Sequence, residues 1–164
     1  MSALRFISIV LLACWVGGLA ALGVVAAPVI FAVITQHDPV AGPVLAGTVF
    51  GAVFAKFQHF AWVLGAILAA VLATRAAIGP RPRWLGLRLW TVAAMLAMSL
   101  VSTLVLTPRI DRLRTGSDTP MALVANDDPR KIEFDRLHGL SSGMMLITIL
   151  AGLGLLWAEA IDRP

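Results

Sequence analysis

Two pairs of ionisable side chains interrupt apolar segments of the sequence and are the residues best suited to chemistry. Lys56 and His59 form one pair and Asp135 and His138 the other, each with the i,i+3 spacing that places both members on one helix face. At 1.5 Å of rise per residue, Lys56 and His138 each lie ~28 Å from the far end of their segment. We therefore expect both pairs in one layer, with Arg109 at the same level after a third segment.

This layer has the residue types of a ligand site. Neutral histidines bind copper or zinc, and Asp135 would orient His138, whereas Lys56 would favour an anionic group. The alternative is that Lys56 and His59 reach lipid headgroups as interface anchors while Asp135 caps the helix that follows it. Both interpretations place these side chains near one membrane boundary, where charged groups are cheap to accommodate.

Ser141 lies close to His138 in sequence, but the two do not make a catalytic site. Asp135, His138 and Ser141 project from one helix, so they cannot converge as a nucleophile, its base and an orienting acid must. Ser141 is better interpreted as the donor of an interhelical hydrogen bond. The sequence also has no glycine-rich phosphate loop and no nucleophile elbow. We therefore expect a protein that is not an enzyme.

A second constellation consists of methionines. Met98, Met144 and Met145 should fall at one depth near the middle of the membrane, one to two helical turns from His138. Thioethers are soft ligands that bind copper(I), and His59 and His138 are the histidines that could complete such a site. The alternative is that these methionines fill irregular gaps in the core.

Composition defines the class of protein. Of the 164 residues, 59% are hydrophobic and 13% are charged, and the mean hydropathy is +0.89. A soluble domain is about half apolar and a quarter charged, so lipid must cover much of this chain. The net charge of +4 comes from arginines at segment ends, which excludes a nucleic-acid-binding stripe. The single cysteine, Cys14, excludes an internal disulfide.

Four long apolar segments predict an all-α integral membrane protein, a four-helix bundle that forms a single domain over residues 1–164. The first two segments exceed a hydrocarbon core of about 30 Å, so their helices should be long and project beyond the bilayer. We expect a kink at Pro28 and a helix end at Pro108. The expected spans are 6–34, 44–74, 84–107 and 137–158, joined by a basic loop over 75–88 and a polar loop over 109–136.

The distribution of Lys and Arg predicts the orientation. The compact 75–88 loop is arginine-rich and the first connection has no Lys or Arg, so we expect both termini in the cytoplasm and the chain in a bacterial-type cytoplasmic (inner) membrane. Gly47, Gly51 and Ala55 form a face of small residues that lets helices approach closely. Besides the lipid bilayer, we expect partners to bind through such faces, either further copies of the chain or a larger membrane complex.

Several stretches of the sequence are similar to a known family. They are W-V-G-G (15–18), A-P-V-I-F (27–31), G-T-V-F-G-A-V-F (47–54), P-R-I-D-R-L-R (108–114) and F-D-R-L-H-G-L-S (134–141). In them the chain resembles the transmembrane protein 205-like family, also called domain of unknown function 4149. The resemblance implies a four-helix membrane protein without an established activity. A more distant similarity to copper-resistance D-type membrane proteins and to membrane protoporphyrinogen oxidases implies copper or haem as ligand.

Three functions follow from these observations. The first is a non-enzymatic protein that binds or passes a small solute or metal ion near the outer leaflet, at His138, Asp135, His59, Lys56, Ser141 and Arg109. The second is a haem- or copper-binding redox protein with His59 and His138 as axial ligands. The third is a structural or assembly subunit of a larger membrane complex.

Overall fold

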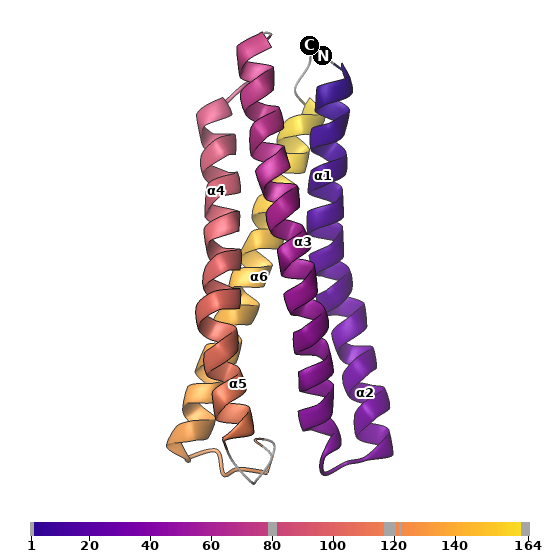
Figure 1. Ribbon diagram of the computed structural model, residues 1–164, viewed down its shortest axis with the longest axis vertical. Coiled ribbons are helices and arrows are strands. Elements are labelled where there is room, and N and C mark those ends of the chain that lie inside the picture. Colours follow the sequence, from indigo (N-terminus) through magenta and orange to yellow (C-terminus); the bar gives the residue numbers. More distant parts are fainter. Residues whose placement is uncertain (1, 79–81, 117–120, 122, 162–164) are drawn as a thin grey trace.

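The computed structural model describes residues 2–78, 82–116, 121 and 123–161, and this part of the chain is helical without a β-strand (Figure 1). The helices are α1 (Ser2–Ala21), the π-helix η1 (Leu22–Ala26), α2 (Ala27–His37), α3 (Gly42–Ile78), α4 (Leu85–Val101), the π-helix η2 (Ser102–Leu106), α5 (Thr107–Thr115) and α6 (Pro129–Ile161). They form four long rods, because η1 joins α1 to α2 and η2 joins α4 to α5 without a break.

Each rod is long and apolar enough to cross a bilayer, which confirms an all-α integral membrane protein with four candidate spans. All four rods, and not only the first two, exceed the ~20 residues that a span needs. The longest, α3, has 37 residues, or ~55 Å of helix. A hydrocarbon core of about 30 Å cannot cover such a length, so part of the bundle projects beyond it.

The predicted loops are too long. The third rod continues to Thr115 and α6 begins at Pro129, so that much of the predicted 109–136 loop is helix. Likewise α3 extends to Ile78 and α4 begins at Leu85, within the predicted 75–88 loop. Ion pairs between residues one helical turn apart, such as Arg114 with Asp111, stabilise such helix ends. Residues 79–81, 117–120 and 122 of the two predicted loops lie outside the described residues.

Two prolines inside the long rods, Pro28 and Pro108, each follow a π-helical turn. Pro28 is the second residue after η1, and Pro108 is the second residue after η2. The amide of Ala27 donates to the carbonyl of Leu22, a bond across five residues instead of four. Such a widened turn accommodates a proline that has no N–H and would crowd an α-helical ladder. Pro108 therefore does not end its helix, contrary to the sequence prediction.

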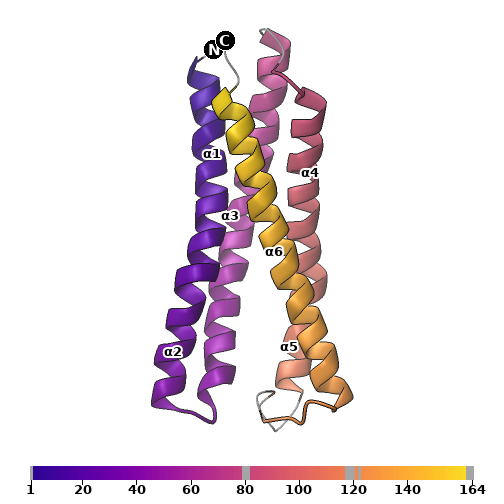
Figure 2. The ribbon, with the colours of Figure 1, turned by 180° about the vertical axis from the view of Figure 1, so that it is seen from behind.

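The bundle has two unlike ends. We call the closed end the one that holds the beginning of α1, the end of α6 and the ends of α3 and α4 that face each other across residues 79–84. The open end holds the turn after α2 and the segment between α5 and α6. Figures 1 and 2 show that at the open end α2 lies beside α3 and α5 lies beside α6, as two separate hairpins.

The core fills the bundle between its middle and the closed end, where α1 packs on α3 and α6 and α4 packs on the same two rods. Trp15 is fully buried there. Glycines allow the close approach: a Cβ on Gly65 would lie 2.9 Å from the Trp15 ring, and one on Gly152 would lie 2.2 Å from Cγ2 of Val16. The buried core residues are Leu12, Trp15, Leu19, Ala61, Leu64, Leu68, Leu72, Val92, Met95 and Leu155.

Substituting Gly152 with Ala should destabilise the bundle, because the added methyl group overlaps Val16 and overpacking costs about 1–3 kcal/mol. Gly154→Ala is the matched control, since a Cβ at Gly154 meets no atom within 4 Å. It should leave stability unchanged or raise it by up to ~1 kcal/mol through helix propensity. Equilibrium unfolding in mixed micelles measures both variants. Equal stability of the two would show that the α1–α6 contact is looser than described.

Candidate functional site

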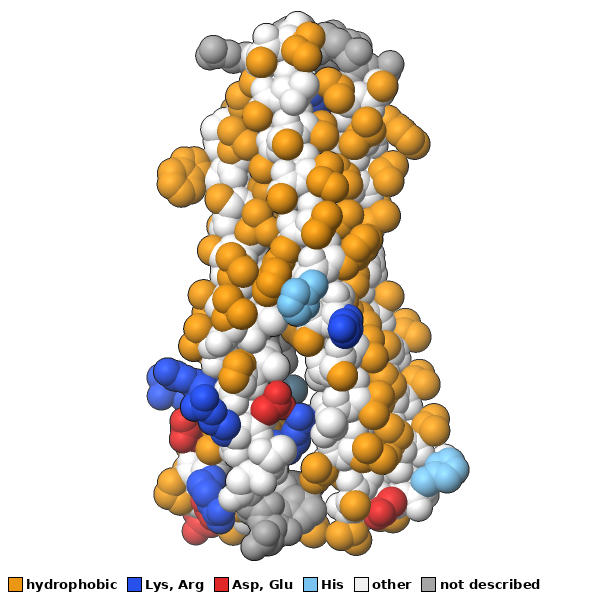
Figure 3. Space-filling model, in the orientation of Figure 1, with side chains coloured by type: hydrophobic (Ala, Val, Ile, Leu, Met, Phe, Trp, Pro, Cys, Tyr) orange, Lys and Arg blue, Asp and Glu red, His pale blue; other side chains and the backbone are white. Residues whose placement is uncertain are grey.

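A cavity of about 560 Å³ lies at the open end between the two hairpins. Its volume is in the range that holds small-molecule ligands, ~300–1,000 Å³. One wall comes from η1, α2 and α3, and the other from α5 and α6. Figure 3 shows the hollow between these halves on the side of the molecule, with charged side chains around it on the half that carries α5 and α6.

The wall from η1, α2 and α3 is formed by glycine and apolar residues. It is lined by Gly23, Ala27, Phe31, Pro43, Val44, Gly47, Phe50, Gly51 and Phe54. The predicted face of small residues, Gly47 and Gly51, therefore borders this cavity. A Cβ on Gly51 would meet no atom within 4 Å, so open space lies beside this glycine. This wall can accommodate an apolar body but offers no charge to it.

The wall from α5 and α6 carries the charges. Arg114 and Lys131 line it, and their side chains are only 13% and 18% exposed. Arg114 pairs with Asp111, while Lys131 pairs with Asp135, whose carboxylate is 55% exposed. An exposed i,i+4 pair is worth only ~0.3–0.5 kcal/mol, so a ligand can compete for the ammonium of Lys131. The wall thus presents two nearly buried cations against the cavity.

Arg114 is held close to the apolar wall and is incompletely satisfied. A Cβ on Gly47 would lie 2.5 Å from its Nη1, so the guanidinium packs directly over this glycine. Its Nε is buried and has no hydrogen-bond partner among the described residues. A buried donor without a partner is costly, and bound water or a ligand commonly satisfies it. The guanidinium of Arg114 therefore has hydrogen-bonding capacity that Asp111 does not use.

Two of the predicted site residues, His138 and Ser141, line this cavity. The His138 ring stacks on Phe134 with a centroid separation of 6.0 Å and an interplanar angle of 1°. Ser141 makes the predicted interhelical hydrogen bond, with 3.0 Å between its Oγ and that of Ser102. Both residues lie deeper in the bundle than Lys131, because α6 begins at Pro129.

Four other predicted residues do not line the cavity. Lys56, His59, Arg109 and Asp135 are exposed and absent from its walls. The Nδ1–H of His59 donates to the carbonyl of Ala55 at 2.7 Å, and the ring packs against Trp62 at a centroid separation of 4.7 Å. The side chains of the predicted layer therefore point in different directions, and only some of them face the cavity. Because of their positions around the axis of α3, Lys56 and His59 point outward, away from the cavity.

Asp135 neither orients His138 nor caps α6. Its carboxylate accepts a hydrogen bond from Lys131, on the same helix. The cap of α6 is Asp128, whose Oδ1 accepts from the amide of Arg130 at 2.8 Å. The side-chain hydrogen bond from Arg130, and then its amide, lower the pKa of Asp128. Asp128 is the better cap because it directly precedes Pro129, the first residue of the helix.

A second, much smaller cavity of about 10 Å³ lies next to the first, since Phe54 and Met145 line both. The three predicted methionines, Met98, Met144 and Met145, border this small cavity together. Its volume corresponds to about one water molecule. Within the described residues, no group of three or more His, Cys, Asp or Glu side chains is placed to hold a metal ion.

Polar side chains surround the methionines. The indole N–H of Trp62 donates to Ser99 Oγ at 2.9 Å, and Ser99 donates to Gln58 Oε1 at 3.1 Å. Gln58 and Ser99 are both buried, and the Ser102–Ser141 bond lies at the same level. Sequence reasoning missed this network because isolated Ser and Gln residues in apolar segments carry no distinctive spacing.

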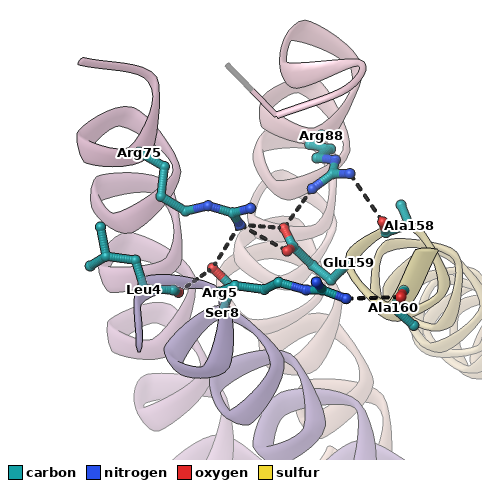
Figure 4. Close-up of polar contacts among 8 residues, drawn as sticks. All are labelled: Leu4, Arg5, Ser8, Arg75, Arg88, Ala158, Glu159 and Ala160. Atoms are coloured by element: carbon teal, nitrogen blue, oxygen red, sulfur yellow. Dashed lines mark hydrogen bonds and ion pairs between the residues drawn. The ribbon is translucent and has the colours of Figure 1, made fainter. Parts of the chain in front are cut away.

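A cluster of buried charges ties the rods together at the closed end (Figure 4). Glu159 of α6, 1% exposed, accepts hydrogen bonds from Arg75 Nη1 of α3 at 2.8 Å and from Arg88 Nη1 of α4 at 2.7 Å. Both arginines are also buried. One carboxylate therefore joins three helices, and its two arginine partners fall within the segment 75–88 for which sequence analysis predicted a basic loop.

The rod that contains α1 joins the same cluster. The hydroxyl of Ser8 lies 3.5 Å from Arg75 Nη1, and Arg5 donates from Nη2 to the carbonyl of Ala160 at 2.8 Å. Figure 4 shows these side chains converging from three sides on the end of α6. All four rods are thus connected at the closed end by hydrogen bonds to or beside Glu159.

Comparison with known proteins identifies the family. Residues 10–118 match the family described as Domain of unknown function (DUF4149), which covers more than half of the chain. The chain belongs to this family. The matched region includes Gly47, Asp111 and Arg114 of the cavity and ends before α6. No curated protein and no solved structure matches the chain. The family therefore fixes no activity, and function must be argued from the cavity.

Removing the charge at Glu159 should destabilise the DUF4149 protein strongly. Glu159→Gln deletes the carboxylate shared by Arg75 and Arg88, and loss of one member of a buried ion pair costs about 3–5 kcal/mol. The control is Glu133→Gln, because Glu133 is an exposed acid on the same helix. Thermal unfolding in detergent should show a large loss for the first variant and little for the second. Equal behaviour would mean that the cluster does not hold the closed end together.

Proposed function

We propose that this DUF4149 protein binds a small amphipathic anion in the open-end cavity and does so without catalysing a reaction. The observation that carries the proposal is the pairing of an apolar wall with two nearly buried cations, Arg114 and Lys131. A carboxylate or phosphate would accept hydrogen bonds from these cations. The apolar body of the ligand would lie against Phe50 and Phe54.

The proposal refines the prediction of a small-solute site near the outer leaflet. The Lys and Arg distribution favours cytoplasmic termini, and on this basis the open end would face the outer side of the inner membrane. His138 and Ser141 keep a place at the site as lining residues. Lys56, His59, Arg109 and Asp135 would act at the membrane boundary instead, as anchors among headgroups.

Replacing Arg114 with Gln should weaken binding of an anionic amphipath by about 10- to 100-fold, because a hydrogen bond to a charged group is worth ~1.5–3 kcal/mol. Arg109→Gln is the matched control, since Arg109 lies on the same helix but is exposed and outside the cavity wall. Lauric acid, lauryl alcohol and lauryltrimethylammonium are titrated into protein held in phosphatidylcholine nanodiscs, with native mass spectrometry as readout.

The acid should bind in preference to the other two probes, and the Arg114 variant should lose that preference while the Arg109 variant keeps it. The proposal fails if the ammonium or the alcohol binds as tightly as the acid. It also fails if both arginine variants bind the acid like the unmodified protein, because the charge of the cavity would then be irrelevant.

A second candidate function is copper(I) binding by Met98, Met144 and Met145. The observation in its favour is that the three thioethers border one small buried cavity. The similarity to copper-resistance D-type proteins points the same way. Haem fits less well, because its proposed axial ligand His59 is turned away from the cavity that His138 lines.

Copper content after loading with copper(I) tests this alternative. Near-stoichiometric copper that is lost in Met144→Leu would support it, because leucine keeps the volume of the side chain and removes the sulfur. Equal copper in the variant and the unmodified protein would exclude a thioether site. The third hypothesis, an assembly subunit, would need a partner surface other than the Gly47/Gly51 face, which borders the cavity.

A further inference from the structure

The cavity has a definite polarity along the bundle axis. Arg114 is the penultimate residue of α5 and Lys131 is the third residue of α6, so both cations lie near the open end. Phe54 and Met145 form its other extreme, toward the core. From Gly47, beside Arg114, to Phe54 is ~10 Å along α3, and from Lys131 to Met145 is ~21 Å along α6. The charged groups therefore lie at the mouth of the cavity. Its deep end, which we call the floor, is apolar and is formed by Phe54 and Met145.

A lipid in the leaflet at the open end has the same polarity. Its acidic headgroup faces the water beyond the membrane, and its chain extends inward by about half of the ~30 Å hydrocarbon core. This half-thickness, ~15 Å, lies between the two distances from the cations to the floor. A lipid could therefore enter the cavity without turning over, with its headgroup remaining at the level of the cations.

The surroundings of the cavity also favour the bilayer as the source of the ligand. The outer surface of the hairpin of α2 and α3 is mostly apolar, with Val29, Val33, Leu45 and Val49 exposed, although Lys56 is also exposed on it and Asp38 at its tip. The opposite hairpin carries more of the exposed charges, including Arg109 and Arg130. Figure 3 shows the hollow on the side of the bundle, with more charged side chains on the half that carries α5 and α6 than on the other half.

We infer that the ligand of the open-end cavity is a single-chain lipid acid taken from the adjacent leaflet, with its acidic group on Arg114 and Lys131 and its chain end between Gly51, Phe54 and Met145. This inference rests on the proposed function and names its substrate class. The volume of about 560 Å³ lies within the ~300–1,000 Å³ that holds small-molecule ligands, which suits one acyl chain with a carboxylate or phosphate.

A larger side chain in place of Gly51 would fill the deep end of the cavity and leave the charged residues Arg114 and Lys131 unchanged. Gly51 lines the cavity, and a Cβ built there meets no atom within 4 Å, so the side chain of Gly51→Leu would begin in open space. Gly139→Leu is the matched control, because Gly139 also has open space around it but does not line the cavity. Both variants keep Arg114 and Lys131.

The test uses full-length protein in phosphatidylcholine vesicles and a stearic acid probe with a photoreactive diazirine at its chain end. Labelling should map to peptides around Phe54 and Met145, and unlabelled stearic acid should suppress it. Butyric acid and inorganic phosphate, supplied from water, should compete far less. Gly51→Leu should reduce the labelling at least about tenfold, a change of ~1.4 kcal/mol, while Gly139→Leu should not.

Each contrary result has a distinct meaning. If butyric acid or phosphate competes as well as stearic acid, the site takes a free anion from water, so the lipid source is wrong while anion binding stands. If the floor is labelled equally in both glycine variants, the chain does not occupy it and the inference is overturned. If stearic acid fails to suppress labelling of the unmodified protein, the cavity does not bind the acid and the proposed function fails as well.

Discussion

The structure depends on one carboxylate. Glu159 accepts hydrogen bonds from Arg75 and Arg88, and so it fixes α3, α4 and α6 against one another at the closed end. Further into the core, close approaches at Gly65 and Gly152 also hold the helices together. Beyond the core, the described residues of the two hairpins show no comparable link, and the π-helical turns η1 and η2 introduce wide turns before Pro28 and Pro108. Because the helices are held together more closely at the closed end than at the open end, space remains between the two hairpins.

That space determines the chemistry available to the protein. An apolar wall from α2 and α3 faces a wall from α5 and α6 that holds Arg114 and Lys131. Two nearly buried cations are costly to keep in such a setting unless acceptors reach them, and Asp111 and Asp135 satisfy them only in part. An acidic group on an apolar body would meet both requirements, and this is the basis of the proposal that the cavity binds an amphipathic anion.

The sequence was sufficient for the fold class and insufficient for the direction in which the polar side chains of the predicted layer point. Hydropathy identifies the four rods because lipid-facing helices must be apolar over a bilayer's thickness. Counting residues along each helix predicts one level for His138 and His59. It cannot show that His138 borders a cavity while His59 contacts Trp62. The buried cluster at the closed end was predictable in principle: Arg75 follows the buried Leu72 by three positions, on the same face of α3. Its partner Glu159 comes from another rod, and such pairing is invisible in a single sequence.

The most direct test of this account is native mass spectrometry of the protein extracted from its own membrane in polymer-bounded lipid patches, without detergent. We expect a single-chain acidic amphipath to remain bound in near-stoichiometric amount. The same molecule should be depleted when Arg114 and Lys131 are both replaced by Gln. A protein that carries no such molecule, or one that retains it equally after loss of both cations, would contradict the assignment of the open-end cavity as an anion site.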